Sequence, residues 1–345
     1  MEVIRNYPIY LHALERMLVR LPEEHPKRQA VQDELAVTKA GYQGELEVDR
    51  HIRRTKLDSP VRVLTDLEIQ VDEEHTIQID TLILTTRGIW ILEAKRIWGT
   101  LVYRENPRRL ERRNDDGTIL TMKCPMLQLE TQIAAVREWL AQRDIHLPAD
   151  GRVAFTYQNT WEGLPEGAPI LPAREVPFYI AREYALSESC IDEEAFERVA
   201  TMLTLERFRF NPYPLCIKFD VNPNELIRGW VCPACGKKMR RESERRVSCV
   251  PCKVAVKPDY GEVILDWLLL VRPTISNLQL RKFLGIQDKH AASRVLRMFE
   301  LETDGESVNR VYRLNFMSDL DGVRLKRKGS GGAVVVRDAK VGARG

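Results

Sequence analysis

Two apolar strands joined by a short turn, at residues 76–95, constrain the fold of this chain more than any other stretch. Residues 76–85 (TIQIDTLILT) and 89–95 (IWILEAK) are rich in β-branched and aromatic residues, and the Thr-Arg-Gly segment between them favours a turn. The second strand is apolar at successive positions, which is typical of a strand covered on both faces. This stretch therefore predicts a β-hairpin inside a buried sheet.

Three charged residues, Asp80, Glu93 and Lys95, stand in this otherwise apolar hairpin. Side chains alternate between the faces of a strand, so Glu93 and Lys95 point the same way, and Asp80 meets them if the hairpin register allows it. Two carboxylates and a lysine at the end of a buried hairpin predict a site for Mg²⁺ or Mn²⁺, with the ammonium free to orient a water or offset phosphate charge. From the hairpin alone, a salt bridge at a strand end is an equally open interpretation.

Length and composition describe a globular protein of two or three domains. The chain has 345 residues, of which 44% are hydrophobic and 30% charged, and its net charge of +3 predicts no partner by itself. The N-terminus lacks the apolar region of a signal peptide, and the longest apolar run, residues 263–271, is too short to span a membrane and contains Asp266. We therefore expect a cytoplasmic protein without membrane contact.

The pattern up to about residue 220 predicts strands flanked by helices. Helices are expected at residues 8–22, 28–55, 125–142 and 193–205, and further strands at 61–71, 152–157 and 176–181. Residues 96–113 are expected to form an arginine-rich loop of the kind that a polyanionic substrate requires, although solvated surface charge is the other interpretation. The fold class predicted here is α/β with a mixed sheet.

Two further polar residues lie beside apolar helical stripes. Glu45 shares a stripe with Val48 and Ile52, and a solvated acid in a first helical turn is the simpler interpretation of it. Gln128 lies one turn into the helix that Pro125 opens, next to the buried stripe.

Several short motifs resemble, in order and spacing, the NERD domain, which is the nuclease-related domain of the restriction-endonuclease-like superfamily. They are Gly44-Glu45, Ile79-Asp80, Glu93-Ala94-Lys95, Gly99, and Cys124-Pro125 followed by Gln128. The resemblance spans about residues 30–150. Three departures concern local hydrogen bonding rather than metal ligands: Ile79 stands where many such nucleases have Pro, Arg96 where a small polar residue is common, and Cys124 where Asn is frequent.

The resemblance implies a restriction-endonuclease-like domain at residues 28–222. It also implies roles: Asp80 and Glu93 hold Mg²⁺, Lys95 positions or activates the attacking water, Glu45 completes the acidic cluster, and Gln128 supports the site. Residues 1–27 are expected to form a helical segment before this domain.

Four cysteines form a second chemical motif. Cys232 and Cys235 are followed, after thirteen residues, by Cys249 and Cys252, so that two Cys-x-x-Cys knuckles predict a tetrahedral Zn²⁺ ribbon at residues 228–258. Four thiolates leave no open position, so the zinc is expected to be structural; free thiols or a redox pair are the alternatives. Lysine and arginine far outnumber acids in this module, which favours contact with phosphates. The other cysteines, Cys124, Cys190 and Cys216, have no partner spacing and are expected to be incidental.

Residues 261–316 predict three short helices and a hairpin turning at Asp304-Gly305, a pattern similar to a winged helix-turn-helix. Its third helix, capped by Asp288, offers a polar face to DNA, although many such domains mediate protein contacts instead. The candidate nucleic-acid-binding residues are Lys289, His290, Ser293, Arg294 and Arg297. The glycine-rich, basic tail at residues 326–345 is expected to be unstructured.

Together these features predict a metal-dependent DNA nuclease, with catalytic Mg²⁺ or Mn²⁺ and structural Zn²⁺, that the zinc ribbon and winged helix target to its substrate. The alternative is a non-enzymatic DNA-binding regulator or scaffold that keeps an inactive nuclease fold. A zinc-dependent hydrolase is disfavoured because the four cysteines leave the metal no water. DNA is the expected partner, and a homodimer stays open because cutting both strands usually needs two active sites.

Overall fold

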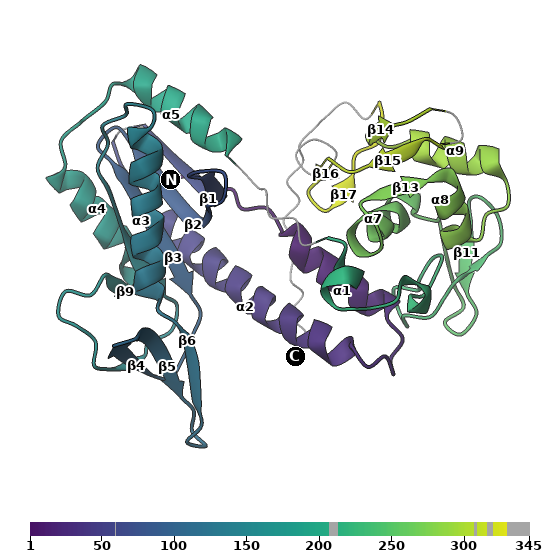
Figure 1. Ribbon diagram of the computed structural model, residues 1–345, viewed down its shortest axis with the longest axis horizontal. Helices are drawn as coiled ribbons and strands as arrows, with labels where there is room; N and C mark the ends of the chain where they lie inside the picture. Colours follow the sequence, from purple (N-terminus) through teal and green to yellow (C-terminus); the bar gives the residue numbers. More distant parts are fainter. Residues whose placement is uncertain (59, 207–212, 307–308, 316–319, 330–345) are drawn as a thin grey trace. The chain divides into compact units, whose positions relative to one another are not determined.

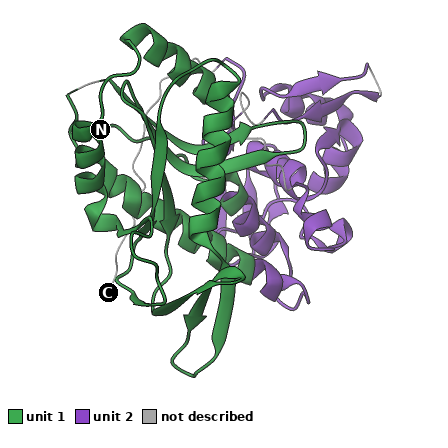
Figure 2. Ribbon diagram, turned by 60° about the vertical axis from the view of Figure 1, so that its left-hand side comes forward, with its two compact units in different colours: residues 1–11, 33–211 green, residues 12–32, 212–345 purple. Residues whose placement is uncertain are grey.

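The structure is a computed structural model that describes residues 1–58, 60–206, 213–306, 309–315 and 320–329. The chain divides into two compact units that interleave along the sequence (Figure 2). The first unit contains residues 1–11 and 33–211, and the second contains residues 12–32 and 212–345. None of the helices in the described ranges combines the length and the apolar composition needed to cross a bilayer.

A five-stranded mixed sheet forms the centre of the first unit, in the order β1-β2-β3-β7-β9 (Figure 1). The predicted hairpin is its antiparallel middle: β2 pairs with β3, and the turn closes through the Thr85 amide and the Gly88 carbonyl at 3.0 Å. Strand β7 continues the sheet in parallel with β3, and β9 in parallel with β7. The strands are β1 (Val61–Gln70), β2 (Thr76–Thr85), β3 (Ile89–Lys95), β7 (Ala149–Phe155) and β9 (Ile170–Pro172).

Helices cover both faces of this sheet, which confirms the predicted fold class. On one face, Trp139 of α3 (Pro125–Ala141) and Phe196 of α5 (Glu193–Leu205) share an apolar cluster with Ile91. On the other face, Val48 of α2 (Arg28–Ile52) and residues of α4 (Val176–Leu186) pack in a second cluster with Trp90. The central strands are apolar at successive positions because each face has a helical layer to contact.

A second, smaller sheet in the first unit has the order β6-β5-β4-β8 (Figure 1). It consists of β4 (Thr100–Glu105), β5 (Arg108–Arg113), β6 (Ile119–Lys123) and β8 (Thr160–Glu162). The arginine-rich stretch after Lys95 is thus mostly a β-hairpin, and the prediction of a loop was wrong. Leu101, Val102 and Tyr103 of β4 and Leu110 of β5 are buried, whereas the arginines of both strands are half-buried or exposed.

The predicted strand at residues 176–181 was also wrong, because this segment begins α4. It follows a 3₁₀ turn, Ala173–Glu175, and its buried residues are Val176, Tyr179 and Ile180. The spacing of these residues is that of one helical face, whereas their β-branched and aromatic character favours a strand. Packing against the second apolar cluster decided in favour of the helix.

The second unit holds the four cysteines and a group of helices with a small sheet. Its elements are the part of α1 (Ile9–Arg20) from His12 on, α6 (Leu215–Lys218), the 3₁₀ turn Pro223–Glu225, β10 (Arg240–Arg241), β11 (Val247–Cys249), β12 (Val254–Val256), α7 (Tyr260–Leu270), β13 (Thr274–Ser276), α8 (Asn277–Leu284), α9 (Lys289–Arg297), β14 (Glu302–Asp304), β15 (Val311–Arg313), β16 (Leu320–Asp321) and β17 (Arg324–Leu325). Local sequence sets the helix ends: Ser276 forms a capping box on α8, Gly285 ends α8 in the left-handed conformation, and Asp288 caps α9.

Two expectations for this unit need correction. Strands β14 and β15 pair from Glu302↔Arg313 to Asp304↔Val311, so residues 305–310 connect them and not a two-residue turn. The first residues of the basic tail are bonded rather than unstructured, since the Glu300 amide donates to the Lys326 carbonyl at 2.9 Å and the Lys328 amide to the Met298 carbonyl at 2.9 Å. The rest of the tail, residues 330–345, lies outside the described residues.

A buried ion cluster ties α1 to α7 inside the second unit. Asp266 is fully buried and accepts hydrogen bonds from Arg16 and Arg20, at 2.7 Å and 2.6 Å to the same carboxylate oxygen. Arg20 also donates to the carbonyls of Ile227 and Gly229, and its guanidinium lies 4.8 Å from the centre of the Phe283 ring. Segments that are about 250 residues apart in the sequence are thereby joined through one carboxylate.

Candidate active site and cysteine cluster

Asp80 and Glu93 face each other across the end of the central hairpin. The β2–β3 register ends with the pair Thr81↔Leu92, so the next step along both strands places Asp80 opposite Glu93. The Ala94 amide donates a hydrogen bond to Asp80 Oδ2 at 3.0 Å, which fixes the carboxylate beside β3. The hairpin register therefore brings together the two carboxylates that the sequence singled out.

The pairing of β1 with β2 is interrupted where Asp66 lies opposite Asp80. Asp66 has a φ of 52°. The regular alternation of β1 side chains between the two faces of the sheet is interrupted there, because Leu64 and Leu67, three residues apart, join the same apolar cluster. Ile79 and Leu82 show the same shift on β2. A local interruption of the strand pairing changes the direction of the side chains beside it. The direction of the Asp80 side chain therefore depends on this interruption and not on the regular alternation of faces along β2.

Glu93 is the buried centre of a polar network. It is 1% exposed, and its two carboxylate oxygens have different partners: Lys95 Nζ contacts Oε1, and Gln132 Nε2 donates to Oε2 at 2.6 Å. Lys95 also donates to Gln128 Oε1 at 3.1 Å. Both glutamines come from α3, four residues apart on one helical face, so this helix orients the lysine and the carboxylate together.

Glu45 approaches from α2 and is held by an arginine. It lies well inside this helix, so the interpretation of an acid in a first helical turn was wrong. Arg5 Nη1 contacts Glu45 Oε2 and Asp66 Oδ1, each at 2.9 Å, while Arg5 Nε donates to Asp49 Oδ2 at 2.8 Å. The Arg5 side chain is fully buried and also donates to the Asp80 carbonyl at 2.9 Å.

The crowding of carboxyl groups shifts their protonation. Burial, together with the charges of Glu93 and Glu45, raises the pKa of Asp80 well above its usual value. Burial, opposed by Arg5 and reinforced by Asp66 and Asp49, raises the pKa of Glu45 to about 7. Burial works against the charge of Lys95, but Glu93 and Asp80 raise its pKa, so it remains an ammonium at neutral pH.

The predicted acidic cluster is only partly assembled. In the described ranges, the four cysteines are the sole group of three or more His, Cys, Asp or Glu side chains placed to share one metal ion. Asp80 and Glu93 meet at the strand ends, whereas Glu45 is drawn toward Arg5. The site therefore has a core of Asp80, Glu93, Lys95 and Gln128, with Glu45 at its edge.

Sequence reasoning missed three residues of this network: Arg5, Asp66 and Gln132. Gln132 had a signal, because it lies four residues after Gln128 on the same helix. No local sequence pattern indicates Asp66 or Arg5. The contacts of Asp66 depend on an interruption in the β1–β2 pairing, and Arg5 contacts Glu45, 40 residues away in the sequence.

The arginines of the second sheet are mostly paired with acids. Arg108 binds Glu130, Arg113 binds Glu162, and Arg104 and Arg109 both bind Glu111. Two of the predicted cations lie against aromatic rings, and one of them, Arg96, is also 3.4 Å from a carboxylate oxygen of Glu47. The Arg96 guanidinium is 4.8 Å from the centre of the Tyr157 ring, and that of Arg112 is 5.9 Å from the centre of the Trp98 ring.

The candidate nucleic-acid-binding residues lie along α9. Lys289, His290, Arg294 and Arg297 are exposed, and Ser293 is half-buried and accepts a hydrogen bond from Asn277 at 2.8 Å. Arg294 lies 3.4 Å from a carboxylate oxygen of Glu244. The helix packs through Ala291, Ala292, Val295 and Leu296, so its polar residues share the opposite side.

The four cysteines Cys232, Cys235, Cys249 and Cys252 converge in the second unit. Their sulfur atoms all lie within 4.8 Å of one another, close to the roughly 3.8 Å edge of a tetrahedron with metal–sulfur bonds of about 2.3 Å. The first knuckle turns through Gly236, whose φ is 68°, and whose amide donates to the Cys232 carbonyl at 2.9 Å. The residue after Cys252, Lys253, has the corresponding positive φ of 57°. Two similar turns thus present two thiols each.

Protonation in this cluster favours a bound cation. The Ala234 amide lowers the pKa of Cys232 to about 7, while the hydrogen bond shared with Cys235 raises the pKa of Cys252 to about 12. Four adjacent thiols cannot all ionise without a compensating positive charge, and a divalent metal supplies it.

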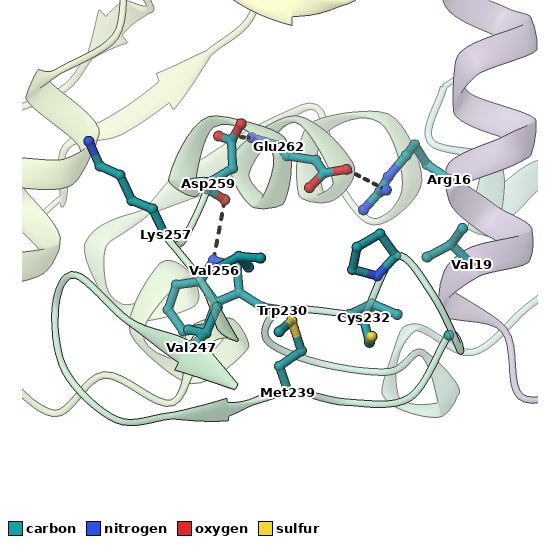
Figure 3. A pocket seen from close by; sticks show the side chains of 13 residues that line it. Arg16, Val19, Trp230, Cys232, Met239, Val247, Val256, Lys257, Asp259 and Glu262 are labelled. Atoms are coloured by element: carbon teal, nitrogen blue, oxygen red, sulfur yellow. Dashed lines mark hydrogen bonds and ion pairs between the residues drawn. The ribbon is translucent and has the colours of Figure 1, made fainter. Parts of the chain in front are cut away.

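A pocket of about 430 Å³ lies beside this cluster (Figure 3). Trp230, Met239 and Val247 line its apolar side, and Figure 3 shows Arg16 and Glu262 joined at its polar side. The Trp230 Nε1 donates to the Asp259 carbonyl at 3.3 Å, so the indole is held in place as part of the wall.

One comparison with known proteins gives a match. Residues 40–156 match the family model of the nuclease-related domain, NERD, which is about a third of the chain. No curated protein and no solved structure matches the chain. The matched residues run from α2 to the end of β7, and Arg5 and the four cysteines lie outside them. The resemblance to the nuclease-related domain is thereby confirmed for residues 40–156, which contain Glu45, Asp80, Glu93, Lys95 and Gln128.

Proposed function

We propose that this protein is a metal-dependent nuclease that hydrolyses DNA phosphodiester bonds. The observation that carries the proposal is the contact of buried Glu93 with Lys95 at the end of β3, with Asp80 opposite on β2, inside a region that matches a nuclease-related domain. Buried carboxylates next to a lysine rarely serve packing alone, and perturbed pKa values of this kind cluster at functional sites.

The donor set suits a divalent cation. Asp80 and Glu93 would hold Mg²⁺ or Mn²⁺, because both ions prefer carboxylate oxygen. Burial and the charges of Glu93 and Glu45 raise the pKa of Asp80, and a bound cation would favour its ionised form. When bound, the cation would polarise the scissile phosphate as a Lewis acid.

The remaining steps belong to side chains of the chain itself. Lys95, kept charged by Glu93 and Asp80, offsets the charge that develops on the phosphate oxygens and orients the attacking water. Gln128 and Gln132 hold Lys95 and Glu93 in place through their hydrogen bonds. Glu45 completes the acidic site when its carboxylate turns from Arg5.

Two modules of the second unit would bring the nuclease to DNA. We assign residues 228–258 to a structural zinc ribbon, supported by the four converging sulfur atoms. We assign residues 261–316 to a winged helix, supported by the order α7-β13-α8-α9-β14-β15 and the sheet order β13-β15-β14. Helix α9, with Lys289, His290, Ser293, Arg294 and Arg297, would then enter the major groove.

One observation favours a second candidate, a DNA-binding scaffold without catalysis. Arg5 forms an ion pair with Glu45, and the carboxylates of Asp80, Glu93 and Glu45 do not converge on one point. Such a protein would bind DNA through the second unit and leave the first unit as a folded support.

Nicking of supercoiled plasmid in Mg²⁺ or Mn²⁺ distinguishes the two candidates. We expect wild-type protein to nick the plasmid and Lys95→Ala and Asp80→Ala each to lower the rate by about 100-fold or more, with DNA binding by gel shift nearly unchanged. Lys56→Ala, at an exposed lysine of the same unit, is the matched control and should cut at the wild-type rate. If wild type shifts the plasmid without nicking it, or both variants nick as fast as wild type, the catalytic assignment is wrong.

A further inference from the structure

Two neighbouring segments lead from the main sheet of the first unit to its second sheet. They are residues 96–99, between β3 and β4, and residues 156–159, between β7 and β8, and we call them the paired connectors. At their start the Thr156 amide donates to the Lys95 carbonyl at 3.0 Å, and at their end the Thr160 amide donates to the Gly99 carbonyl at 3.2 Å. The paired connectors are therefore held side by side at both ends.

Each connector exposes one large aromatic side chain. Trp98 is 56% exposed and Tyr157 is 37% exposed. Each ring has a guanidinium over it, that of Arg112 over Trp98 and that of Arg96 over Tyr157. Arg112 belongs to β5, whereas Arg96 is the first residue of its connector and also lies 3.4 Å from a carboxylate oxygen of Glu47. A guanidinium thus lies over one face of each partly exposed ring, and the opposite face is the one that a base can stack on. Aromatic rings and cations in this combination have the composition of a surface that binds bases and phosphates together.

The paired connectors begin at the candidate active site. Lys95 is the last residue of β3, and three residues of extended chain from Lys95 to Trp98 reach about 10 Å at most. Gly44, which immediately precedes Glu45, lies so close to the connector that a Cβ added to it would be 3.0 Å from Arg96 Cβ. The connector that carries Trp98 therefore begins at Lys95, and the one that carries Tyr157 is bonded to Lys95 through Thr156.

We propose that Trp98 and Tyr157 form a base-stacking subsite that holds unpaired nucleobases of the strand being cut. The proposal rests on the proposed nuclease function and adds the substrate class, a nucleic-acid strand that is single-stranded or unwound beside the scissile phosphate. Bases inside a duplex are already stacked on their neighbours, so an exposed indole or phenol ring competes for them only where pairing is absent. Arg96 and Arg112 attract the phosphates on either side of the stacked bases.

The test compares two oligonucleotides of equal length and charge, dT15 and a 15-mer made entirely of abasic residues. Full-length protein is titrated against each, labelled with fluorescein, by fluorescence anisotropy in buffer without added divalent cation, so that no cleavage occurs. We expect tighter binding of dT15. Trp98→Ala and Tyr157→Ala should each weaken dT15 binding by about 5- to 150-fold, with less than a twofold change for the abasic strand.

Two further variants sharpen the comparison. Trp98→Phe keeps a π face and should restore dT15 affinity to within a few fold of wild type. Phe178→Ala removes an aromatic residue that is 76% exposed on α4, away from the paired connectors, and should change neither affinity. Circular dichroism checks the folding of every variant, and if an alanine variant unfolds, Trp98→Leu, which keeps apolar bulk without a π face, replaces it.

The proposal is overturned if the variants without a ring bind dT15 as tightly as wild type, or if wild type binds the abasic strand as tightly as dT15. In either case plasmid nicking by the wild type still supports the nuclease. If wild type neither binds any of the oligonucleotides nor nicks plasmid, the proposed function fails and the stacking subsite fails with it.

Discussion

At the scale of single residues, the most consequential side chain is Arg5. Its guanidinium contacts three carboxylates, of Glu45, Asp49 and Asp66, although it is itself fully buried. Burial works against its charge, but the hydrogen bond with Asp49 and the neighbouring acids raise the pKa of Arg5, so it stays a cation. A buried charge persists only where it is paired in this way, and the arrangement lets several acids gather beside the candidate active site.

The protonation of Glu45 gives a pH dependence for metal binding. Its pKa is raised to about 7, so the carboxyl holds a proton below that pH and is ionised above it. A cation competes with the proton, so the apparent affinity for Mg²⁺ should increase by about tenfold between pH 6 and pH 8 for one proton released. Glu45→Gln should give weaker binding with a flatter pH profile, because one of the competing protons is gone.

Isothermal titration with Mg²⁺ at pH 6, 7 and 8 measures this effect. Glu194→Gln, at an acid whose side chain is 86% exposed on α5, serves as the control and should retain the wild-type profile. If the Mg²⁺ affinity changes with pH equally in wild type and in Glu45→Gln, Glu45 takes no part in binding the metal.

Some site residues were predictable at this scale and others were not. Asp80, Glu93 and Lys95 stood out because charges are rare in apolar strands, but the hairpin register that brings Asp80 opposite Glu93 was left open by the sequence. Gln128 came from the resemblance to a nuclease-related domain. Arg5 could not be found this way, because its partners come from α2, β1 and β2 and are brought to it only by the packing of the whole unit.

At the scale of elements, local pattern and packing competed. Helix α5 has the predicted bounds, since Asp192 caps it and its apolar residues keep helical spacing. Helix α4 was mistaken for a strand because a six-residue window rich in β-formers is ambiguous until its neighbours are known. The arginine-rich hairpin β4–β5 was missed because arginine and glutamate outnumber the apolar residues of its two strands, so the strand pattern is weak.

The cysteine knuckles give a prediction at this scale. We expect purified protein to contain about one zinc per chain, and Cys232→Ser to lose it and to lower the thermal midpoint of the second unit, because metal binding and folding of such modules are coupled. Plasma mass spectrometry measures the zinc, and circular dichroism follows unfolding. Cys190→Ser is the control, as this exposed cysteine lies in the first unit. A full zinc content in Cys232→Ser would rule out the four-cysteine site.

At the scale of the whole molecule, the two units are not consecutive pieces of sequence. Residues 12–32 belong to the second unit together with everything after residue 212, although the nuclease-related region lies between them. This exchange could not be predicted from the sequence, since nothing in the amphipathic pattern of α1 says which apolar surface it covers.

The buried cluster around Asp266 joins residues 12–32 to the rest of the second unit. Removing the charge of Asp266 leaves the buried Arg20 without a carboxylate partner and Arg16 with Glu262 alone, so Asp266→Asn should lower the free energy of unfolding of the second unit by about 3–5 kcal/mol. Although burial alone would raise the pKa of Asp266, Arg20 and Arg16 hold it below its usual value. The stabilisation is therefore present above about pH 4 and is lost as the pH falls further, so the difference between variant and wild type should shrink in acid.

Urea unfolding at pH 7 and pH 3 measures both parts of this prediction. Glu197→Gln breaks the exposed pair with Arg62 and should cost less than about 1 kcal/mol at either pH. An Asp266→Asn protein as stable as wild type at pH 7 would mean that the ion cluster does not hold the second unit together.

The position of Arg5 bears on where this nuclease-like unit begins. The family match opens at residue 40, yet the cation that neutralises its acids comes from 35 residues upstream. An excised fragment of residues 40–156 would set Glu45, Asp49 and Asp66 against one another with no guanidinium between them, and would also forfeit the apolar cover of α4 and α5. Residues 40–156, which the family model matches, are thus fewer than the residues that the first unit needs to pair its buried charges and cover its sheet. Activity and stability measured on that fragment would not be those of the intact unit.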